Sequence, residues 1–252
     1  MRQYTSLSAE VFGFIKRHTF YMHEDLSIAA NLLGDPGRAA MLLSLMGGIA
    51  LPAGELAAIA NVSAQTASGH LAKLIEGRLL SVERQGRHRY YRLSSAEVAD
   101  AIEALLVLTA RPNPGDRSHS LCPASAGSLG HARTCYSHLA GWLGVRITET
   151  LEERDLLRAS DAKTYNVTPS GRAWMEALGI ELPSSDLSQK KLARRCLDWT
   201  ERRHHLAGTL GCTMYKRFND LRWMAPIRDT RAVRVTLEGK HQLWDLLRIP
   251  IG

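Results

Sequence analysis

The alternation of apolar and polar positions between residues 51 and 93 predicts two helices and a two-stranded hairpin. Leu56, Ile59 and Ala60 have the spacing that buries one face of a short helix. The apolar positions of the next segment form a stripe along a second helix, which consists of Ala67, Leu71, Leu74 and Ile75. Ser63 is suited to cap this second helix and Gly77 to end it. Segments 79–83 and 88–93 are then expected to form the two strands of the hairpin.

The outward face of the second helix and the tip of the hairpin are polar and basic. The outward residues are small or hydrogen-bonding, which suits contact with base edges and phosphates: Gln65, Thr66, Ser68, Gly69 and Lys73. From residue 70 to residue 92 six Lys and Arg side chains face only Glu76 and Glu83. A helix, a turn, a second helix and a basic hairpin form the winged helix-turn-helix, which places its second helix in the major groove of DNA. The alternative is a solvated hairpin with no role in DNA binding.

Residues 25–110 resemble the ArsR/SmtB family of bacterial winged-helix repressors. The resemblance rests on residues 33–38 (LGDPGR), on 62–71 (VSAQTASGHL), which match the recognition helix, and on the wing from Arg84 to Leu93. It implies a homodimer that binds a palindromic operator in double-stranded DNA and is released by a small effector. It also implies that Ser63, Gln65, Thr66, Ser68 and His70 face DNA, with Arg84, Arg87 and Arg89 on the wing. Lys73 joins this set as an outward base.

Two metal sites known in this family are absent from the matching positions. The helix before the recognition helix, residues 55–60 (ELAAIA), has no cysteine. The last helix of the domain, residues 95–110, contains Glu97, Asp100 and Glu103 but no histidine. The resemblance therefore predicts DNA binding as the output of the protein but does not identify the signal it senses.

Length and composition agree with a two-domain, nucleic-acid-binding protein. A chain of 252 residues has room for two domains that each bury a core. The net charge of +7 favours a polyanionic partner. We find no run of about twenty apolar residues and no signal-peptide pattern, so we expect a cytoplasmic protein with no membrane partner. In that compartment the four cysteines are expected to be free, ligating or redox-active.

An approximate internal repeat defines the second half of the chain. Residues 138–144 (HLAGWLG) recur as 205–211 (HLAGTLG), and 165–172 recur as 233–240. The expected domains are therefore an N-terminal extension (1–24), the winged helix-turn-helix and dimerisation domain (25–110), a linker rich in Pro, Gly and Ser (111–130) and a sensing domain (131–252). We predict a mainly α fold with small β-hairpin wings. The sensing domain would contain two winged-helix-like repeats, 131–180 and 190–252, each reading as two helices, a hairpin and a helix opened by Thr168 or Thr236.

The candidate chemistry lies at the start of each repeat. Cys135 and His138 are three residues apart, as on one face of a helix, and the second copy contains Cys196 and His205. If a pseudo-twofold axis brings the two starts together, these residues form a Cys₂His₂ set, which suits zinc or another borderline-soft divalent metal ion. The alternative is that the cysteines are small buried apolar residues and that the histidines bond to the backbone.

Other sensing chemistries stay open. Cys135 could pair with Cys196 or Cys122 as a thiol redox or persulfide sensor, with Arg133, Arg194 and Arg195 stabilising a thiolate. An organic effector could bind between the repeats, where all five tryptophans occur, although we expect Trp174 and Trp244 to be ordinary core residues.

An enzyme domain fused to a DNA-binding module is the least favoured class, because no phosphate-loop, HExxH or GxSxG motif is present. We therefore predict a DNA-binding transcriptional regulator. It would be a dimeric repressor, built from helices near 25–33 and 95–110, whose effector is sensed in the C-terminal domain.

Overall fold

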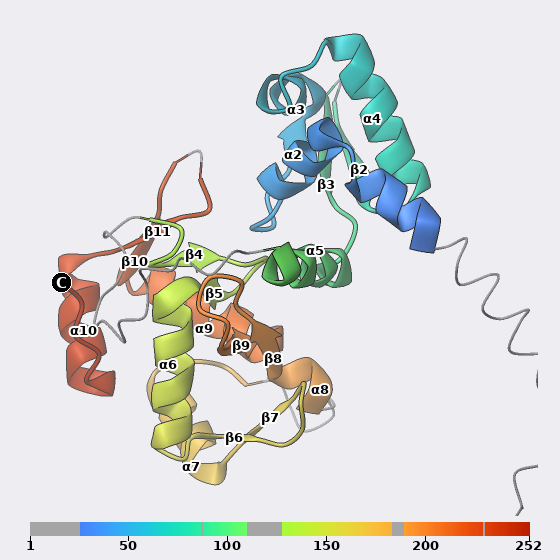
Figure 1. Cartoon of the computed structure of the whole chain (residues 1–252). Helices are drawn as coiled ribbons and strands as arrows, with labels where there is room; N and C mark the ends of the chain where they lie inside the picture. Colours follow the sequence, from blue (N-terminus) through green and yellow to red (C-terminus); the bar gives the residue numbers. More distant parts are fainter. Residues whose placement is uncertain (1–25, 87, 110–127, 183–188, 229) are drawn as a thin grey trace, which may run out of the picture. The chain divides into compact units, whose positions relative to one another are not determined.

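The computed structural model describes residues 26–86, 88–109, 128–182, 189–228 and 230–252. The chain divides into two compact units (Figure 1): one takes in the residues up to Leu45 and Ala50–Ser94, the other Met46–Ile49 and Ser95–Gly252. The N-terminal extension, nearly all of the expected linker and Cys122 lie outside the described residues.

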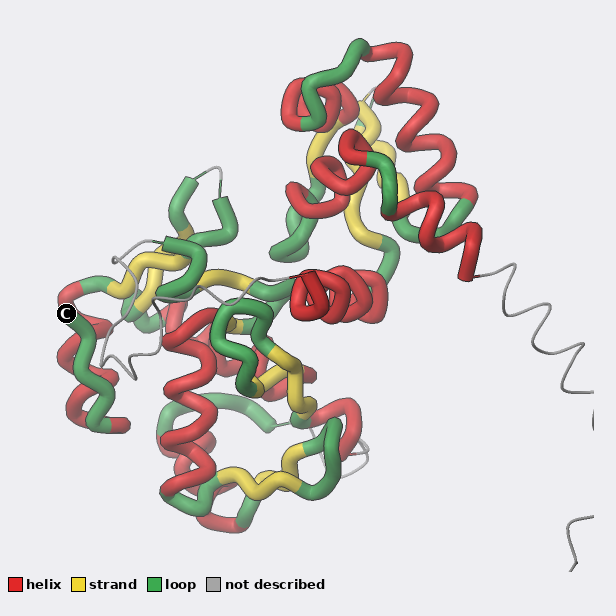
Figure 2. The backbone as a smooth tube through the Cα atoms, viewed as in Figure 1, coloured by secondary structure: helices red, strands yellow, loops and turns green. Residues whose placement is uncertain are grey.

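The first unit is a winged helix-turn-helix. Its elements are a helical segment over 26–33, α2 (Pro36–Ser44), β1 (Leu51–Pro52), α3 (Ala53–Ile59), α4 (Ala64–Glu76), β2 (Leu80–Gln85) and β3 (His88–Leu93). The three strands form one antiparallel sheet in the order β1-β3-β2, with the long β2–β3 hairpin as the wing (Figure 2). The predicted second helix and hairpin are therefore both present, within one or two residues of the expected bounds.

Local capping explains why these helices begin where they do. Asp35 caps α2 by accepting a hydrogen bond from the backbone N–H of Arg38 at 2.8 Å. Ser63 caps α4 in the same way, accepting from the backbone N–H of Thr66 at 3.1 Å. The apolar face of α4 is narrower than expected: Ala67, Leu71 and Leu74 are buried, but Ile75 is 36% exposed, and Ile59 of α3 is 47% exposed. Ile59 is the last residue of α3 and Ile75 the last but one of α4, so each lies in the final turn of its helix.

Helix α5 (Ala96–Thr109) groups with the second unit. From the sequence, this helix was expected to be the last one of a DNA-binding domain that ends at residue 110. The first compact unit ends instead at Ser94. Ion pairs from α5 to Arg194 and Arg231 explain why it belongs with the residues that follow it.

The second unit contains the repeat as two copies of hairpin, helix, hairpin and helix (Figure 2). The first copy consists of β4 (Arg133–Thr134), β5 (Leu139–Ala140), α6 (Gly141–Glu153), β6 (Leu157–Ala159), β7 (Tyr165–Val167) and α7 (Pro169–Ala177). A short helix, α8 (Gln189–Leu192), precedes the second copy. That copy consists of β8 (Arg194–Leu197), β9 (His204–Ala207), α9 (Gly208–Asp220), β10 (Met224–Pro226), β11 (Val233–Val235) and α10 (Leu237–Leu247).

The two copies agree in local detail. Gly141 and Gly208 open α6 and α9 with left-handed φ angles of 79° and 78°. Thr168 and Thr236 cap α7 and α10 as predicted, accepting from the backbone N–H groups of Gly171 and Gly239 at 2.9 and 3.0 Å. The helix expected at the start of each copy was wrong, because a hairpin occupies that place in both.

The copies interlock around one core. Helix α6 packs against β9 of the second copy, and α9 packs against β5 of the first. A Cβ atom at Gly144 would lie 2.6 Å from the carbonyl oxygen of Leu139, and one at Gly211 would lie 2.4 Å from that of Leu206. Only glycine permits each hairpin to approach its helix so closely. The shared apolar core includes Leu143, Ile147, Leu210, Met214 and Phe218.

Candidate functional site

Two thiols and two imidazoles converge where the first hairpins of the two copies meet. The ligand atoms of Cys135, His138, Cys196 and His205 all lie within 4.8 Å of one another, and all four residues are buried. The Nε2 atoms of His138 and His205 are 3.1 Å apart. The predicted grouping of these four residues is therefore present in the structure.

The hairpins give each copy the same pair of side chains. Cys196 on β8 is the register partner of His205 on β9. In the first copy the backbone N–H of Cys135 donates to the carbonyl oxygen of His138 at 3.0 Å, across a two-residue turn. The expectation that Cys135 and His138 share a helix face was wrong, since they flank a tight turn. The second hairpin has a longer loop, and this insertion had obscured the equivalence of the two cysteines in the sequence.

The longer loop supplies a buried carboxylate behind His205. Asp198 is inaccessible to solvent, and its Oδ2 atom lies 3.3 Å from Nδ1 of His205. The same oxygen accepts hydrogen bonds from Nη2 of Arg133 at 2.9 Å and from the backbone N–H of Gly141 at 2.8 Å. Nδ1 of His205 is buried and makes no hydrogen bond in the described part of the chain, so Asp198 acts on the ring through its charge. That charge favours a proton on Nδ1 and leaves Nε2 for the cluster. Asp198 was not predicted as a site residue, because no sequence motif relates its position to that of His205.

The electrostatics of the cluster favour negative charge on sulfur. Hydrogen bonding from Cys135 lowers the pKa of Cys196 against the opposing effect of burial, and His205 lowers it further. The hydrogen bond to Cys196 and burial raise the pKa of Cys135. Burial alone would lower the pKa of His205, but the charges of Cys196 and Asp198 raise it to about 9. The lowered pKa of Cys196 favours a thiolate at this position, with His205 as a neighbouring positive charge.

This donor set matches the requirements of a four-coordinate zinc ion. Thiolate and neutral imidazole are the ligands of closed, tetrahedral Cys₂His₂ sites. Bond lengths of about 2.0–2.1 Å to nitrogen place two ligating nitrogens about 3.3 Å apart in a tetrahedral complex, close to the distance observed between His138 and His205. Cys212 is a third thiol nearby, with its Sγ atom 2.8 Å from Oγ of Ser137; it was not identified from the sequence.

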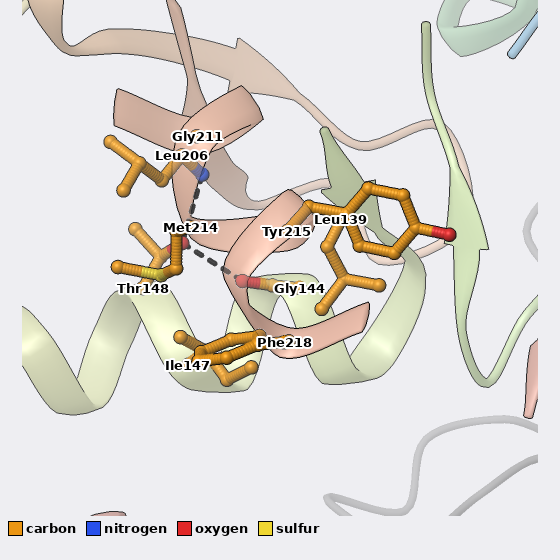
Figure 3. Close-up of a pocket in the computed structure, with 9 residues that line it drawn as sticks. All are labelled: Leu139, Gly144, Ile147, Thr148, Leu206, Gly211, Met214, Tyr215 and Phe218. Carbon is orange, nitrogen blue, oxygen red and sulfur yellow. Dashed lines mark hydrogen bonds between the residues drawn. The ribbon is translucent and has the colours of Figure 1, made fainter. Parts of the chain in front are cut away.

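In the described part of the chain, the cavity between the helices of the two repeats is not lined by tryptophan. A cavity between α6 and α9 has a volume of about 10 Å³, room for about one water molecule. Its lining includes Gly144, Thr148 and Phe218 but no tryptophan (Figure 3). Thr148 fills its polar side by accepting from the backbone N–H of Leu206 and donating to the carbonyl oxygen of Gly144. Trp142 and Trp223 are buried in the core, whereas Trp244, expected there, is 48% exposed on α10.

The residues expected to contact DNA lie mainly on the exposed face of α4 and on the wing. Ser63, Gln65, Thr66, Ser68, Lys73, Arg84 and Arg89 are exposed. Arg84 and Arg89 are register partners on β2 and β3. His70 is less exposed than the others: its side chain is 15% exposed and its Nε2 atom lies 3.6 Å from Oδ1 of Asp35 at the start of α2. Arg87 lies outside the described residues.

Comparison with known proteins identifies a relative that spans both units. YdfF of Bacillus subtilis strain 168, described as an uncharacterized HTH-type transcriptional regulator, is 42% identical over 219 residues, which cover 87% of this chain and 95% of YdfF. No family model matches the sequence. In the described part of the chain, no helix has the length and apolar character needed to cross a membrane.

Solved structures match a smaller share of the chain. NolR from Sinorhizobium fredii is 27% identical and covers 42% of this chain and 96% of its own, with a TM-score of 0.34. A homodimeric winged helix-turn-helix domain of Mb0332 from Mycobacterium bovis, titled a possible ArsR-family regulator, is 19% identical and covers 48% of this chain and 100% of its own, with a TM-score of 0.35. The relationship to known regulators rests on YdfF, because it spans most of both proteins.

Proposed function

Because this chain belongs to the helix-turn-helix transcriptional regulators, we propose that it is a dimeric, metal-responsive repressor of the ArsR/SmtB type. It is a DNA-binding transcriptional regulator. Its proposed signal is a zinc ion or a similar divalent metal ion, bound by the cluster of Cys135, His138, Cys196 and His205. The observation that carries the proposal is the convergence of four buried ligand atoms within 4.8 Å of one another.

The protein provides a ligand shell suited to regulation. When bound, the ion would add a positive charge that neutralises the thiolates and would cross-link the two repeats, which contribute one Cys and one His each. Asp198 holds His205 in place, and Arg133 and Gly141 hold Asp198. Four protein ligands leave no open coordination position for a substrate, which is the arrangement of non-catalytic sites.

DNA recognition is assigned to the exposed face of α4 and to the wing. Gln65 and Ser68 are exposed on α4 and carry groups that read base edges. Lys73, Arg84 and Arg89 are exposed bases that would neutralise phosphates. His70 is not part of this proposed contact set, because its ring faces Asp35.

The dimer is assigned in part to α5. Four exposed apolar residues of this helix are spaced at i, i+3, i+4 and i+7: Ala101, Ala104, Leu105 and Leu108. The exposed Glu97 lies one turn before them. Leu108 is 80% exposed. A stripe of this kind buries itself against a second helix, and a second copy of the chain would provide an identical one.

A thiol sensor at the same residues is the second candidate. Cys135 and Cys196 are buried neighbours whose sulfur atoms lie within 4.8 Å of each other. Two-electron oxidation by a peroxide would join them as a disulfide, with both thiol protons and both electrons passing to the peroxide to form two waters or a water and an alcohol. The metal and thiol proposals use the same two residues, so they are separated by the state of the purified protein and by its response to each reagent.

The functional test is a DNA titration on the full chain with the upstream DNA of its own gene. Metal-free protein and protein loaded with one equivalent of zinc are compared at a fixed salt concentration, with and without peroxide. A metal-responsive repressor loses DNA affinity when zinc is added, by a factor of about 5–150. Equal affinity with and without zinc would overturn the proposal, and a response to peroxide alone would establish the thiol sensor in its place.

A further inference from the structure

Two ion pairs join α5 to the rest of the second unit. Asp100 accepts from Nη2 of Arg194 at 2.6 Å, and Glu103 accepts from Nη1 of Arg231 at 3.1 Å. Asp100 and Glu103 are three residues apart, so both carboxylates leave the same face of the helix. Ala99 and Ile102 are buried on this side of α5. One face of α5 is therefore fixed by charge, while the apolar stripe ending at Leu108 is exposed.

Each arginine of these pairs is tied to the Cys₂His₂ cluster. Arg194 lies on β8, two residues before Cys196. Arg231 lies beside the chain that leads to Cys135: the backbone N–H of Thr134 donates to the carbonyl oxygen of Arg231 at 2.9 Å. Nη1 of Arg231 also lies 3.4 Å from the carbonyl oxygen of Thr134 and 3.5 Å from that of Cys135. A shift of either cysteine therefore moves an arginine that holds α5.

The Glu103 pair is the more constrained of the two. The side chains of Glu103 and Arg231 are 2% and 13% exposed, against 29% and 32% for Asp100 and Arg194. Oε2 of Glu103 is buried and has no hydrogen-bond partner in the described part of the chain. A buried carboxylate that depends on a single arginine follows that arginine when it moves, because separating the two would leave an uncompensated charge.

Ion binding requires a movement at this place. Ligand atoms spread over as much as 4.8 Å must close to the separations of about 3.3–3.8 Å that a tetrahedral zinc ion imposes. The two cysteines lie on separate hairpins, so any closure between them is shared by β8 and the Thr134–Cys135 segment.

We propose that the pairs Arg194–Asp100 and Arg231–Glu103 transmit occupancy of the Cys₂His₂ site to α5. Ion binding moves the two arginines together with their cysteines, and the paired carboxylates then reposition α5 and its exposed apolar stripe. The coupling rests on the proposed function, since it needs both a bound ion and a dimer whose geometry depends on α5. It differs from direct ligation of the ion by α5, because Asp100 and Glu103 act through arginines and not on the ion.

The test compares the wild-type chain with the Asp100→Asn, Glu103→Gln double variant and with Glu153→Gln. The last of these removes an ion-paired carboxylate from α6 and leaves α5 untouched. For each protein we would measure zinc affinity without DNA, DNA affinity without zinc, and DNA affinity with zinc. The ratio of the two DNA affinities is the coupling, and linkage requires DNA to change zinc affinity by the same factor.

The expected result is a double variant that binds zinc within about threefold of wild type but whose coupling falls to within about twofold of unity, while Glu153→Gln keeps the wild-type value. A double variant that binds zinc and keeps the wild-type coupling would overturn the inference. If the double variant fails to bind zinc, the ratio of DNA affinities without and with zinc is measured for Asp100→Asn alone. This single variant suits the test because the Asp100–Arg194 pair is partly exposed and tolerates substitution. A wild-type chain that binds no zinc, or shows no coupling, would overturn the proposed function itself. Zinc binding and coupling of the wild type are therefore measured before any variant is compared.

Discussion

The imidazoles of His138 and His205 face each other with their Nε2 atoms 3.1 Å apart, although they belong to different copies of the repeat. Their ring centroids are 5.1 Å apart. Gly144 and Gly211 make this approach possible: a Cβ atom at Gly144 would lie 3.6 Å from Cβ of His205, and one at Gly211 would lie 3.3 Å from Cβ of His138. Each copy thus packs the Cβ atom of the other copy's histidine against a glycine of its own helix.

The glycines at the helix–hairpin contacts should be intolerant of a methyl group. Gly144→Ala and Gly211→Ala place Cβ against a backbone carbonyl that has no room to yield, so we expect each to destabilise the second unit by about 1–3 kcal/mol. Thermal unfolding monitored by circular dichroism measures the loss. Gly69→Ala, at an open position of α4, is the matched control and should raise stability by up to about 1 kcal/mol. Equal stability of all three variants would contradict the described packing.

The carboxylate behind His205 should set the affinity for the ion. Asp198→Asn removes the charge that orients the ring, so we expect zinc affinity to fall about 10–100-fold. Competition with a chromophoric zinc chelator measures the change, and the exposed Asp220→Asn on α9 is the control. An unchanged affinity in Asp198→Asn would contradict the role of this carboxylate in holding His205 as a ligand.

The wing should contribute affinity that depends on salt. Replacing Arg84 and Arg89 together with Ala removes two exposed charges that face the same end of the hairpin. We expect weaker binding to all DNA sequences and a slope of log affinity against log salt that is shallower by about 1 for each lost phosphate contact. Arg172→Ala with Arg234→Ala removes the same charge from the second unit as a control. Unchanged affinity of the wing variant at low salt would refute the wing assignment.

Readout of bases should depend on Gln65 and not on His70. Gln65→Ala should change which operator positions matter, at a cost of about 1–3 kcal/mol for a lost base contact. His70→Asn should leave DNA affinity within about twofold of wild type, because the ring is turned toward Asp35. Binding selection from a randomised operator library separates the two effects. A changed base preference in His70→Asn would restore the family expectation for that residue.

The winged helix-turn-helix could be predicted from the sequence because its signals are local. Each of its signals involves only a few neighbouring positions. These signals are the helix caps at Asp35 and Ser63, the apolar stripe through Leu71 and Leu74, and the basic hairpin. The pairing of the two Cys/His sets was also predictable, since the repeat HLAG marks equivalent places in both copies. The orientation of His70 could not be predicted, because it depends on a contact with Asp35, more than thirty positions away.

The rest of the site depends on the tertiary fold. The start of each repeat was taken for a helix because three-residue spacing fits one, but the turn between Cys135 and His138 closes with a hydrogen bond that a hairpin needs. Asp198 lies in an insertion that only the second copy has, so comparing the copies could not identify it. Arg231 is far from Glu103 and Cys135 in sequence, and only the packing of the hairpins brings the three together.

The most direct test of the metal site is the metal content of the full chain, purified without chelator or histidine tag and measured by elemental mass spectrometry. The account predicts about one zinc or other divalent ion per chain in the wild type and background levels in the Cys135→Ser, Cys196→Ser double variant, with Cys212→Ser retaining the ion. A metal-free wild type that also fails to take up added zinc, or a double variant that still binds a full equivalent, would contradict it.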